Sequence, residues 1–266
     1  MAEPLLIEHA GPVLRLRMNR PHLHNAFDPA LIAALTAALR AAGDAAGDDT
    51  AVRVVVLEGE GASFSAGADL RWMRGMAAAS EDENRADALA LARLMRTLDE
   101  LPRPTIARVH GPAFGGGVGL VACCDIAIGT PQARFGLTES RLGLLPAVIS
   151  PYVIDAIGPR QARRWFATAE TFDAATALQV GLLHQVVDAA ALDGAVAAQV
   201  DLLCRAAPHA TALAKVLVRD AAGRDDAPAR DRANADLIAR LRVSPEGQEG
   251  IGAFLEKRPP AWAARG

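Results

Sequence analysis

The run AVRVVVLEG, residues 51–59, constrains the fold more than any other stretch of this sequence. Its β-branched residues do not alternate with polar ones, which is typical of a strand buried on both faces of a sheet. Such strands occur in α/β proteins, where helices cover both faces. The run leads directly into GASFSAGADL (61–70), a stretch of small residues that favours close approach of the backbone to another group.

Segments with strand and helix patterns alternate up to about residue 187. Strands are predicted at 12–19, 51–59, 105–111, 125–128, 133–140 and 184–187, and helices at 29–43, 83–101, 115–124 and 150–159. Asp28 is the expected N-cap of the first helix, with Pro29 at its first position. From residue 188 onward the pattern is helical and rich in Ala. We therefore expect an α/β core at 1–195 and a helical C-terminal domain at 196–266.

Composition limits the classes of function. The chain has 266 residues, 51% of them hydrophobic, which is enough for one large core. The net charge of −3 gives no electrostatic reason to expect nucleic-acid binding. No signal peptide or run of about 18 apolar residues is visible, so we expect no membrane span and a cytoplasmic location. The three cysteines and six histidines lack metal-ligand spacing, so no metal is expected.

A second stretch of small residues, HGPAFGGGVG (110–119), also follows a predicted strand. Three consecutive glycines at a helix start weaken the helix by roughly 1 kcal/mol each relative to Ala. A chain tolerates this where side chains would block a ligand, and a helix N-terminus offers free N–H groups to a negatively charged oxygen. Tight turns or close helix packing are the alternative explanation. A dinucleotide-binding fingerprint and a P-loop are disfavoured, because their spacing and residues are missing.

Five motifs in order carry a resemblance to a known family: NRPHLHNAFD, SFSAGADL, HGPAFGGGVGLVACCDIAI, ARFGLTESRLGLLP and AFLEKRPPAW. Together they resemble the enoyl-CoA hydratase/isomerase (crotonase) family from about residue 5 to 262. GLLPAVISPYV and SPEGQEGIGAFLEKR look closest to the branch acting on methylglutaconyl-CoA and related branched acyl-CoAs in leucine and isoprenoid breakdown. The resemblance implies a spiral of ββα units followed by a helical trimerisation domain, and homotrimers or hexamers made of two trimers.

The resemblance also implies a site for an acyl-CoA thioester, with CoA as part of the substrate and no separate cofactor. The backbone N–H groups of Ala68 and Gly116 match the oxyanion hole, and Glu139 matches a catalytic carboxylate. The remaining positions match contacts to the CoA or acyl group, with Lys257 reaching CoA phosphate across a subunit boundary. These positions are His24, Ala26, Ala66, Asp69, Leu70, Arg71, Gly115, Thr138, Pro146 and Lys257.

The sequence departs from the two-glutamate hydratases at one position. The second acid of those enzymes should lie three residues after Gly116, where this chain has Gly119. The turn that helps to seat water, PGAGG in the family, reads PAVI at 146–149. Glu139 alone would then carry the acid/base chemistry, with a pKa raised by an apolar pocket that Leu137, Leu144 and Leu145 would supply. An ion pair with Arg141 is the alternative explanation for Glu139.

We expect an acyl-CoA hydratase, acting on a branched or carboxylated enoyl-CoA such as methylglutaconyl-CoA. The alternatives are a Δ3,Δ2-enoyl-CoA isomerase that uses Glu139 alone, a thioester hydrolase, and a non-catalytic CoA- or RNA-binding relative. Ser65 lacks the Gly-x-Ser-x-Gly frame of a serine hydrolase nucleophile. Tyr152 is the only tyrosine, and we expect its side chain to pack in the core. Polarisation of a substrate by its hydroxyl is the alternative role.

Overall fold

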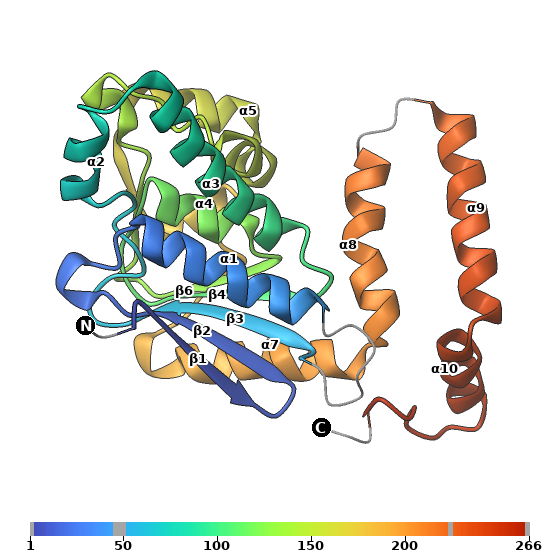
Figure 1. The fold of residues 1–266 in the computed structure, drawn as a ribbon. Coiled ribbons are helices and arrows are strands. Elements are labelled where there is room, and N and C mark those ends of the chain that lie inside the picture. Colours follow the sequence, from blue (N-terminus) through green and yellow to red (C-terminus); the bar gives the residue numbers. More distant parts are fainter. Residues whose placement is uncertain (1–2, 45–51, 223–225, 264–266) are drawn as a thin grey trace.

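The computed structural model describes residues 3–44, 52–222 and 226–263, and a layered α/β body makes up most of them (Figure 1). Its main sheet has the strand order β1-β2-β3-β4-β6-β9. The bounds are β1 Leu5–Ala10, β2 Val13–Met18, β3 Val54–Gly59, β4 Thr105–Val109, β6 Ile126–Gly129 and β9 Gln185–Val186. Only the β1–β2 pair is antiparallel. The predicted central strand is confirmed as β3, although residue 51 lies outside the described ranges.

A smaller second layer runs beside the main sheet. It contains β5 Ala113–Phe114, β7 Arg134–Gly136 and β8 Thr171–Asp173. Two single bridges, Phe27 with Ala68 and Ser65 with Ala113, continue this layer toward the N-terminal part of the chain. After β2, β3, β4 and β6, the chain thus passes through a short extended segment of the second layer before the next helix. This repetition is the expected spiral of ββα units, and the second layer is where the loops after the main strands meet.

The helices begin where the sequence provides caps. The body contains α1 Pro29–Asp44, α2 Leu70–Met76, α3 Glu81–Asp99, α4 Gly116–Cys123, α5 Ser150–Thr168, α6 Ala174–Gln179 and α7 Leu192–Arg205. Asp28 Oδ1 accepts the Leu31 N–H at 2.8 Å, as predicted for the cap of α1. Ser80 and Glu83 form a capping box at the start of α3. The predicted helix at 150–159 continues to residue 168, with a kink at Gly158.

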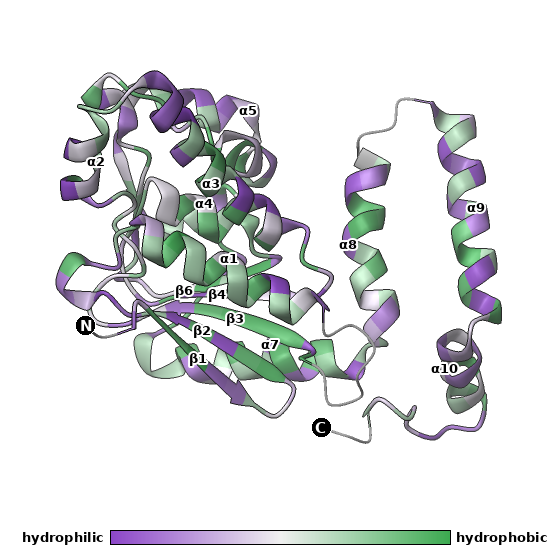
Figure 2. Cartoon of the chain, in the orientation of Figure 1, coloured by the Kyte–Doolittle hydropathy of each residue, from purple (hydrophilic) through white to green (hydrophobic). Residues whose placement is uncertain are grey.

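Two hydrophobic clusters cover the two faces of the main sheet. The larger one packs Leu16, Leu57, Leu35 and Met95 between the sheet and helices α1 and α3. The smaller one packs Val54 and other residues of the opposite face against α7, through Leu192 and Val196. Figure 2 shows the resulting apolar band along β3. Each fully buried side chain of this size contributes about 1.5–3 kcal/mol, which explains why an uninterrupted apolar strand lies at the centre.

The chain then leaves the body as three helices, α8 Pro208–Ala222, α9 Ala227–Val243 and α10 Pro245–Leu255, which we call the C-terminal arm (Figure 1). The expected domain boundary between residues 195 and 196 falls inside α7, a helix that packs on the sheet. Among the described side chains of the arm, only Ala253 is buried. Its exposed apolar side chains are Val216, Leu217, Val218, Ile238, Val243, Ile251, Phe254 and Leu255.

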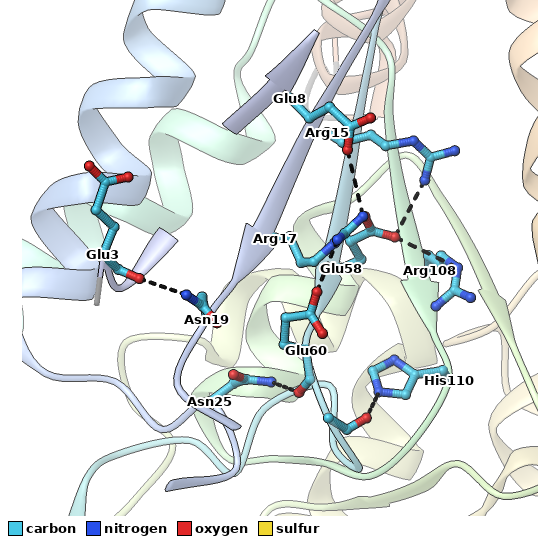
Figure 3. A network of polar contacts seen from close by, with 11 residues as sticks. Glu3, Glu8, Arg15, Arg17, Asn19, Asn25, Glu58, Glu60, Arg108 and His110 are labelled. Atoms are coloured by element: carbon cyan, nitrogen blue, oxygen red, sulfur yellow. Dashed lines mark hydrogen bonds and ion pairs between the residues drawn. The ribbon is translucent and has the colours of Figure 1, made fainter. Parts of the chain in front are cut away.

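A network of charged side chains secures the N-terminal hairpin to the sheet (Figure 3). The buried carboxylate of Glu58 on β3 accepts the Arg17 guanidinium at 2.9 Å and lies 3.4 Å from Arg15 and 3.7 Å from Arg108. A carboxylate buried at this depth is tolerated because cations from both neighbouring strands surround it. The network ends at the loop after β3, where the first stretch of small residues begins.

Candidate active site

Ser65 organises the loop that follows β3. Its side chain is fully buried, and its hydroxyl donates to Asn25 O at 2.9 Å and accepts the Gly67 N–H at 3.3 Å. Its backbone N–H donates to Pro112 O, and its carbonyl accepts the Phe114 N–H. One small polar residue therefore ties together three segments that are far apart in the sequence. This role accounts for Ser65 without any nucleophilic chemistry.

Two further side chains fasten the same loop. The Asn25 side-chain amide donates to the carbonyls of Glu60 and Ser63, each at 2.8 Å. The His110 ring lies 2.9 Å from the Gly61 carbonyl, and Figure 3 shows Asn25 and His110 approaching from opposite sides. His24 and Asn25 adopt positive φ angles of 52° and 54°, which turns the 20–26 loop back onto residues 60–66. The loop is therefore held in place before any ligand binds.

The two glycine-rich stretches meet at Gly67. This residue has φ of +81°, and a Cβ atom there would lie 2.7 Å from Phe114 O and 3.4 Å from Gly116 N. Only glycine permits both the backbone angle and this approach. Among the described residues, no protein acceptor is recorded for the N–H of Ala68 or of Gly116. Unpaired backbone donors are rare in folded proteins, so neighbouring free amides are suited to bind an oxygen of a ligand.

The carboxylate of Glu139 lies beside this pair of amides. Glu139 begins the short 3-10 helix Glu139–Leu142, and its Oε1 is 3.0 Å from the position of a Cβ atom on Gly115. Its Oε2 is buried and has no hydrogen-bond partner among the described residues. Burial raises the pKa of Glu139 above its ordinary value. The alternative ion pair with Arg141 is absent from the salt bridges of the described chain.

The surroundings of Glu139 differ from the sequence prediction in one respect. Leu137 is fully buried, but Leu144 and Leu145 are 51% and 72% exposed. These two leucines therefore do not form the closed pocket predicted for them in the single chain. Thr138 directly precedes Glu139 and is half-buried, and Pro146 is buried at the end of the same loop.

Gly119 lies one helical turn after Gly115, on the same face of α4. A Cβ atom at Gly119 would lie 2.4 Å from Ile149 Cγ2 and 3.3 Å from Met95 Cε. The side chain of Ile149 thus fills the space where a two-glutamate hydratase would carry its second acid. The two departures seen in the sequence are therefore linked, because Ile149 is the last residue of the PAVI turn and packs against Gly119. No sequence pattern could reveal this contact, because the two residues are 30 positions apart.

Of the other expected contact positions, three lie at the loop junction and three are exposed on the surface. His24, Ala26 and Ala66 line the same loop junction: His24 O accepts the Ala66 N–H at 2.8 Å, and His24 Nδ1 lies 3.0 Å from Ser63 Oγ. Leu70 and Arg71 begin α2, and both are exposed. Lys257 is exposed as well and follows α10, on the far side of the molecule from α2 (Figure 1).

Asp69 has a structural task. Its Oδ1 accepts the N–H groups of Arg71 and Trp72, which caps α2, and its Oδ2 is 3.0 Å from the Arg20 guanidinium. Burial by itself would raise the pKa of Asp69, but these hydrogen bonds and the Arg20 charge outweigh it and lower the pKa. Both carboxylate oxygens are thus engaged in positioning α2.

No group of three or more His, Cys, Asp or Glu side chains is placed to hold a metal ion in the described ranges. None of the helices described is long and apolar enough to cross a membrane.

Comparison with known proteins places the chain in a family. The model of the enoyl-CoA hydratase/isomerase family matches residues 8–265. The chain belongs to this family, whose members act on acyl-CoA thioesters.

Its relatives include the 2,3-dehydroadipyl-CoA hydratase of Escherichia coli, which is 31% identical, with 98% of this chain and 99% of that protein covered. An enoyl-CoA hydratase of Shewanella pealeana is 43% identical, with a TM-score of 0.92 over 97% of this chain and 96% of the other. AtuE of Pseudomonas aeruginosa is 39% identical, with a TM-score of 0.92 over 98% and 100%. The crotonase fold is therefore confirmed.

Proposed function

We propose that this protein adds water to an enoyl-CoA, or removes it in reverse, using Glu139 as its only catalytic carboxylate. The observation that carries the proposal is the juxtaposition of two free amides, Ala68 and Gly116, with a buried carboxylate that has an unpartnered oxygen. The thioester oxygen would accept both N–H groups. The acyl carbons next to it would then lie within reach of Glu139.

One carboxylate suffices for the complete reaction. The Glu139 carboxylate takes a proton from water, the resulting hydroxyl adds to C3, and the electron pair of the C2–C3 double bond moves onto the thioester oxygen. The amides of Ala68 and Gly116 stabilise this enolate, each by about 3–4 kcal/mol if they act as other oxyanion holes do. The protonated Glu139 then delivers its proton to C2, the enolate collapses, and the carboxylate is restored. Burial supports this double role, because it brings the pKa of Glu139 closer to neutral.

For the substrate we propose a branched or carboxylated enoyl-CoA such as 3-methylglutaconyl-CoA, in leucine breakdown and in the cytoplasm. The motifs GLLPAVISPYV and SPEGQEGIGAFLEKR support this class. The similarity to a hydratase named for 2,3-dehydroadipyl-CoA, whose acyl group carries a second carboxyl, supports it too.

A second candidate, isomerisation of a 3-enoyl-CoA to a 2-enoyl-CoA, is favoured by the packing of Ile149 against Gly119. An apolar side chain at that place offers no group to activate water. A 1,3-proton shift, by contrast, needs only one carboxylate to remove a proton from C2 and return it to C4.

The C-terminal arm is proposed to hold a trimer together, or a hexamer of two trimers. Its exposed apolar side chains support this, because an isolated arm would leave them in water. Lys257 would reach the CoA phosphate of a neighbouring subunit, and the core and arm would act as separate domains.

The test compares wild type with Glu139→Gln and Glu139→Asp on crotonyl-CoA, 3-methylglutaconyl-CoA and a 3-enoyl-CoA. Hydration removes the enoyl absorbance, whereas isomerisation creates it. We expect hydration in the wild type and a loss of roughly 10²- to 10⁴-fold in Glu139→Gln. Unchanged activity in Glu139→Gln would refute the role of Glu139. Isomerisation without hydration would replace the first function by the second.

A further inference from the structure

We propose that Phe27 is the positioning residue that sets the distance between the two donors of the oxyanion hole. The inference rests on the proposed role of Ala68 and Gly116. Phe27 lies at the end of the 20–27 loop, directly before the N-cap of α1, and its side chain is buried. It contacts both donors, one through its backbone and the other through its ring.

The backbone of Phe27 controls Ala68. Phe27 N–H donates to Gly67 O at 2.6 Å, and Asp69 N–H donates to Phe27 O at 2.9 Å. These two bonds bracket Ala68 in the bridge, and no described residue accepts the N–H of Ala68 itself. The orientation of the Ala68 amide is therefore determined by where Phe27 lies.

The ring of Phe27 controls Gly116. A Cβ atom on Gly116 would lie 2.5 Å from Phe27 Cε2 and 3.0 Å from Cδ2, so the ring edge rests against the Gly116 backbone. Gly116 is the first residue of α4. A smaller side chain at position 27 would leave a gap behind this amide, into which the start of α4 can relax.

Phe27 is itself firmly anchored. The next residue, Asp28, caps α1 through Leu31 N–H and lies 2.9 Å from Arg20, whose guanidinium also pairs with Asp69. Position 27 is therefore fixed by α1 on one side and by the loop carrying Ala68 on the other. A single side chain thereby relates the start of α4 to the loop after β3.

The variants are Phe27→Leu and Phe27→Ala, with Phe172→Leu as the matched control. Phe172, on β8, is also a buried ring, and its centroid lies 4.3 Å from that of Trp165. We expect Phe27→Leu to lower kcat by about tenfold or more while KM stays within about twofold, because misplacing a preorganised donor weakens the transition state more than the bound substrate. Phe172→Leu should lose comparable stability and keep its kcat.

A second measurement does not depend on turnover. Infrared difference spectra of butyryl-CoA labelled with ¹³C at the carbonyl should show a lowered C=O stretch on binding to wild type and to Phe172→Leu. Phe27→Leu should show a smaller shift at saturating ligand. If Phe27→Leu keeps both the full C=O shift and the full kcat, the positioning role of Phe27 is overturned, while the proposed oxyanion hole stands. Absence of any shift in the wild type would instead overturn the proposed oxyanion hole.

Discussion

Ile149 Cγ2 lies 2.4 Å from the place that a Cβ atom on Gly119 would occupy. The glycine and the isoleucine are thus two halves of one packed contact beside the proposed catalytic carboxylate. This contact leads to the first prediction, since neither residue can change independently of the other.

Gly119→Glu, the change that would restore a second acid, should destabilise the protein by about 1–3 kcal/mol, because the new side chain collides with Ile149. The double variant G119E/I149G should lose less stability than the sum of the G119E and I149G losses, because the new side chain occupies the space that Ile149 leaves. Chemical denaturation measures all three losses. Gly194→Ala, at a helical glycine with open space around it, is the control and should be nearly neutral or stabilising. Strictly additive losses in G119E, I149G and the double variant would contradict the contact.

The pH dependence of kcat/KM should report the burial of Glu139. Burial raises the pKa of this carboxyl, so the protonated and inactive form persists to higher pH than for an exposed glutamate. Because the base must be ionised to accept the proton of water, kcat/KM should rise with pH through that raised pKa. The inflection should lie above the ordinary glutamate value of about 4.3. An acid limb at or below that value would show that Glu139 is not the group that limits the rate.

Ser65→Ala should affect both stability and turnover. The substitution removes the hydroxyl that joins Asn25 O to Gly67 N–H and leaves both backbone groups buried. We expect a loss of about 1–3 kcal/mol in the free energy of unfolding, and a lower kcat because Gly67 precedes Ala68. Thr97→Ala, which removes a hydroxyl bonded within α3, serves as the comparison and should change little. Full activity in Ser65→Ala would show that Gly67 is held without this hydroxyl.

We expect Asp69 to affect stability and CoA affinity because it caps α2, and not because its charge contacts the ligand. Asp69→Ala removes the cap of α2 together with the Arg20 ion pair, and a lost cap costs about 0.5–2 kcal/mol. Asp69→Asn keeps an oxygen that caps the helix and should lose less stability than Asp69→Ala. Affinity for CoA, measured by calorimetry, should fall in the same order, because Leu70 and Arg71 begin α2. Equal losses of affinity in the two variants would mean that the ligand requires the charge of Asp69, which both substitutions remove.

Elements of the fold were predictable from the sequence where residues close together in the chain determine them. The uninterrupted run of β3, the Asp28 cap of α1 and the helix that starts at the Gly-rich stretch all follow from nearest neighbours in the chain. Strand β1 was not predicted, and neither was the helix that Asp69 caps. Each depends on a partner elsewhere: β1 on β2, and α2 on the Arg20 loop.

The chemistry of the site was predictable only in part. Glu139, Ala68 and Gly116 came from motifs, and the structure brings them together. The roles of Ser65, Phe27 and Ile149 come from contacts between distant segments, and their residue types are ordinary in a hydrophobic chain. The exposed state of Leu144 and Leu145 is likewise a property of the folded surface and not of the local pattern.

The filled space beside Gly119 also constrains how such a site can change over generations. A lineage that carries isoleucine at 149 loses stability if it gains the acid at 119 in one step, because the intermediate form is overpacked. The alternative is to accept a smaller residue at 149 first, and the cavity that this leaves has a stability penalty of its own. If Glu139 acts alone as proposed, the contact would make a return to two-carboxylate chemistry costly for descendants of this chain.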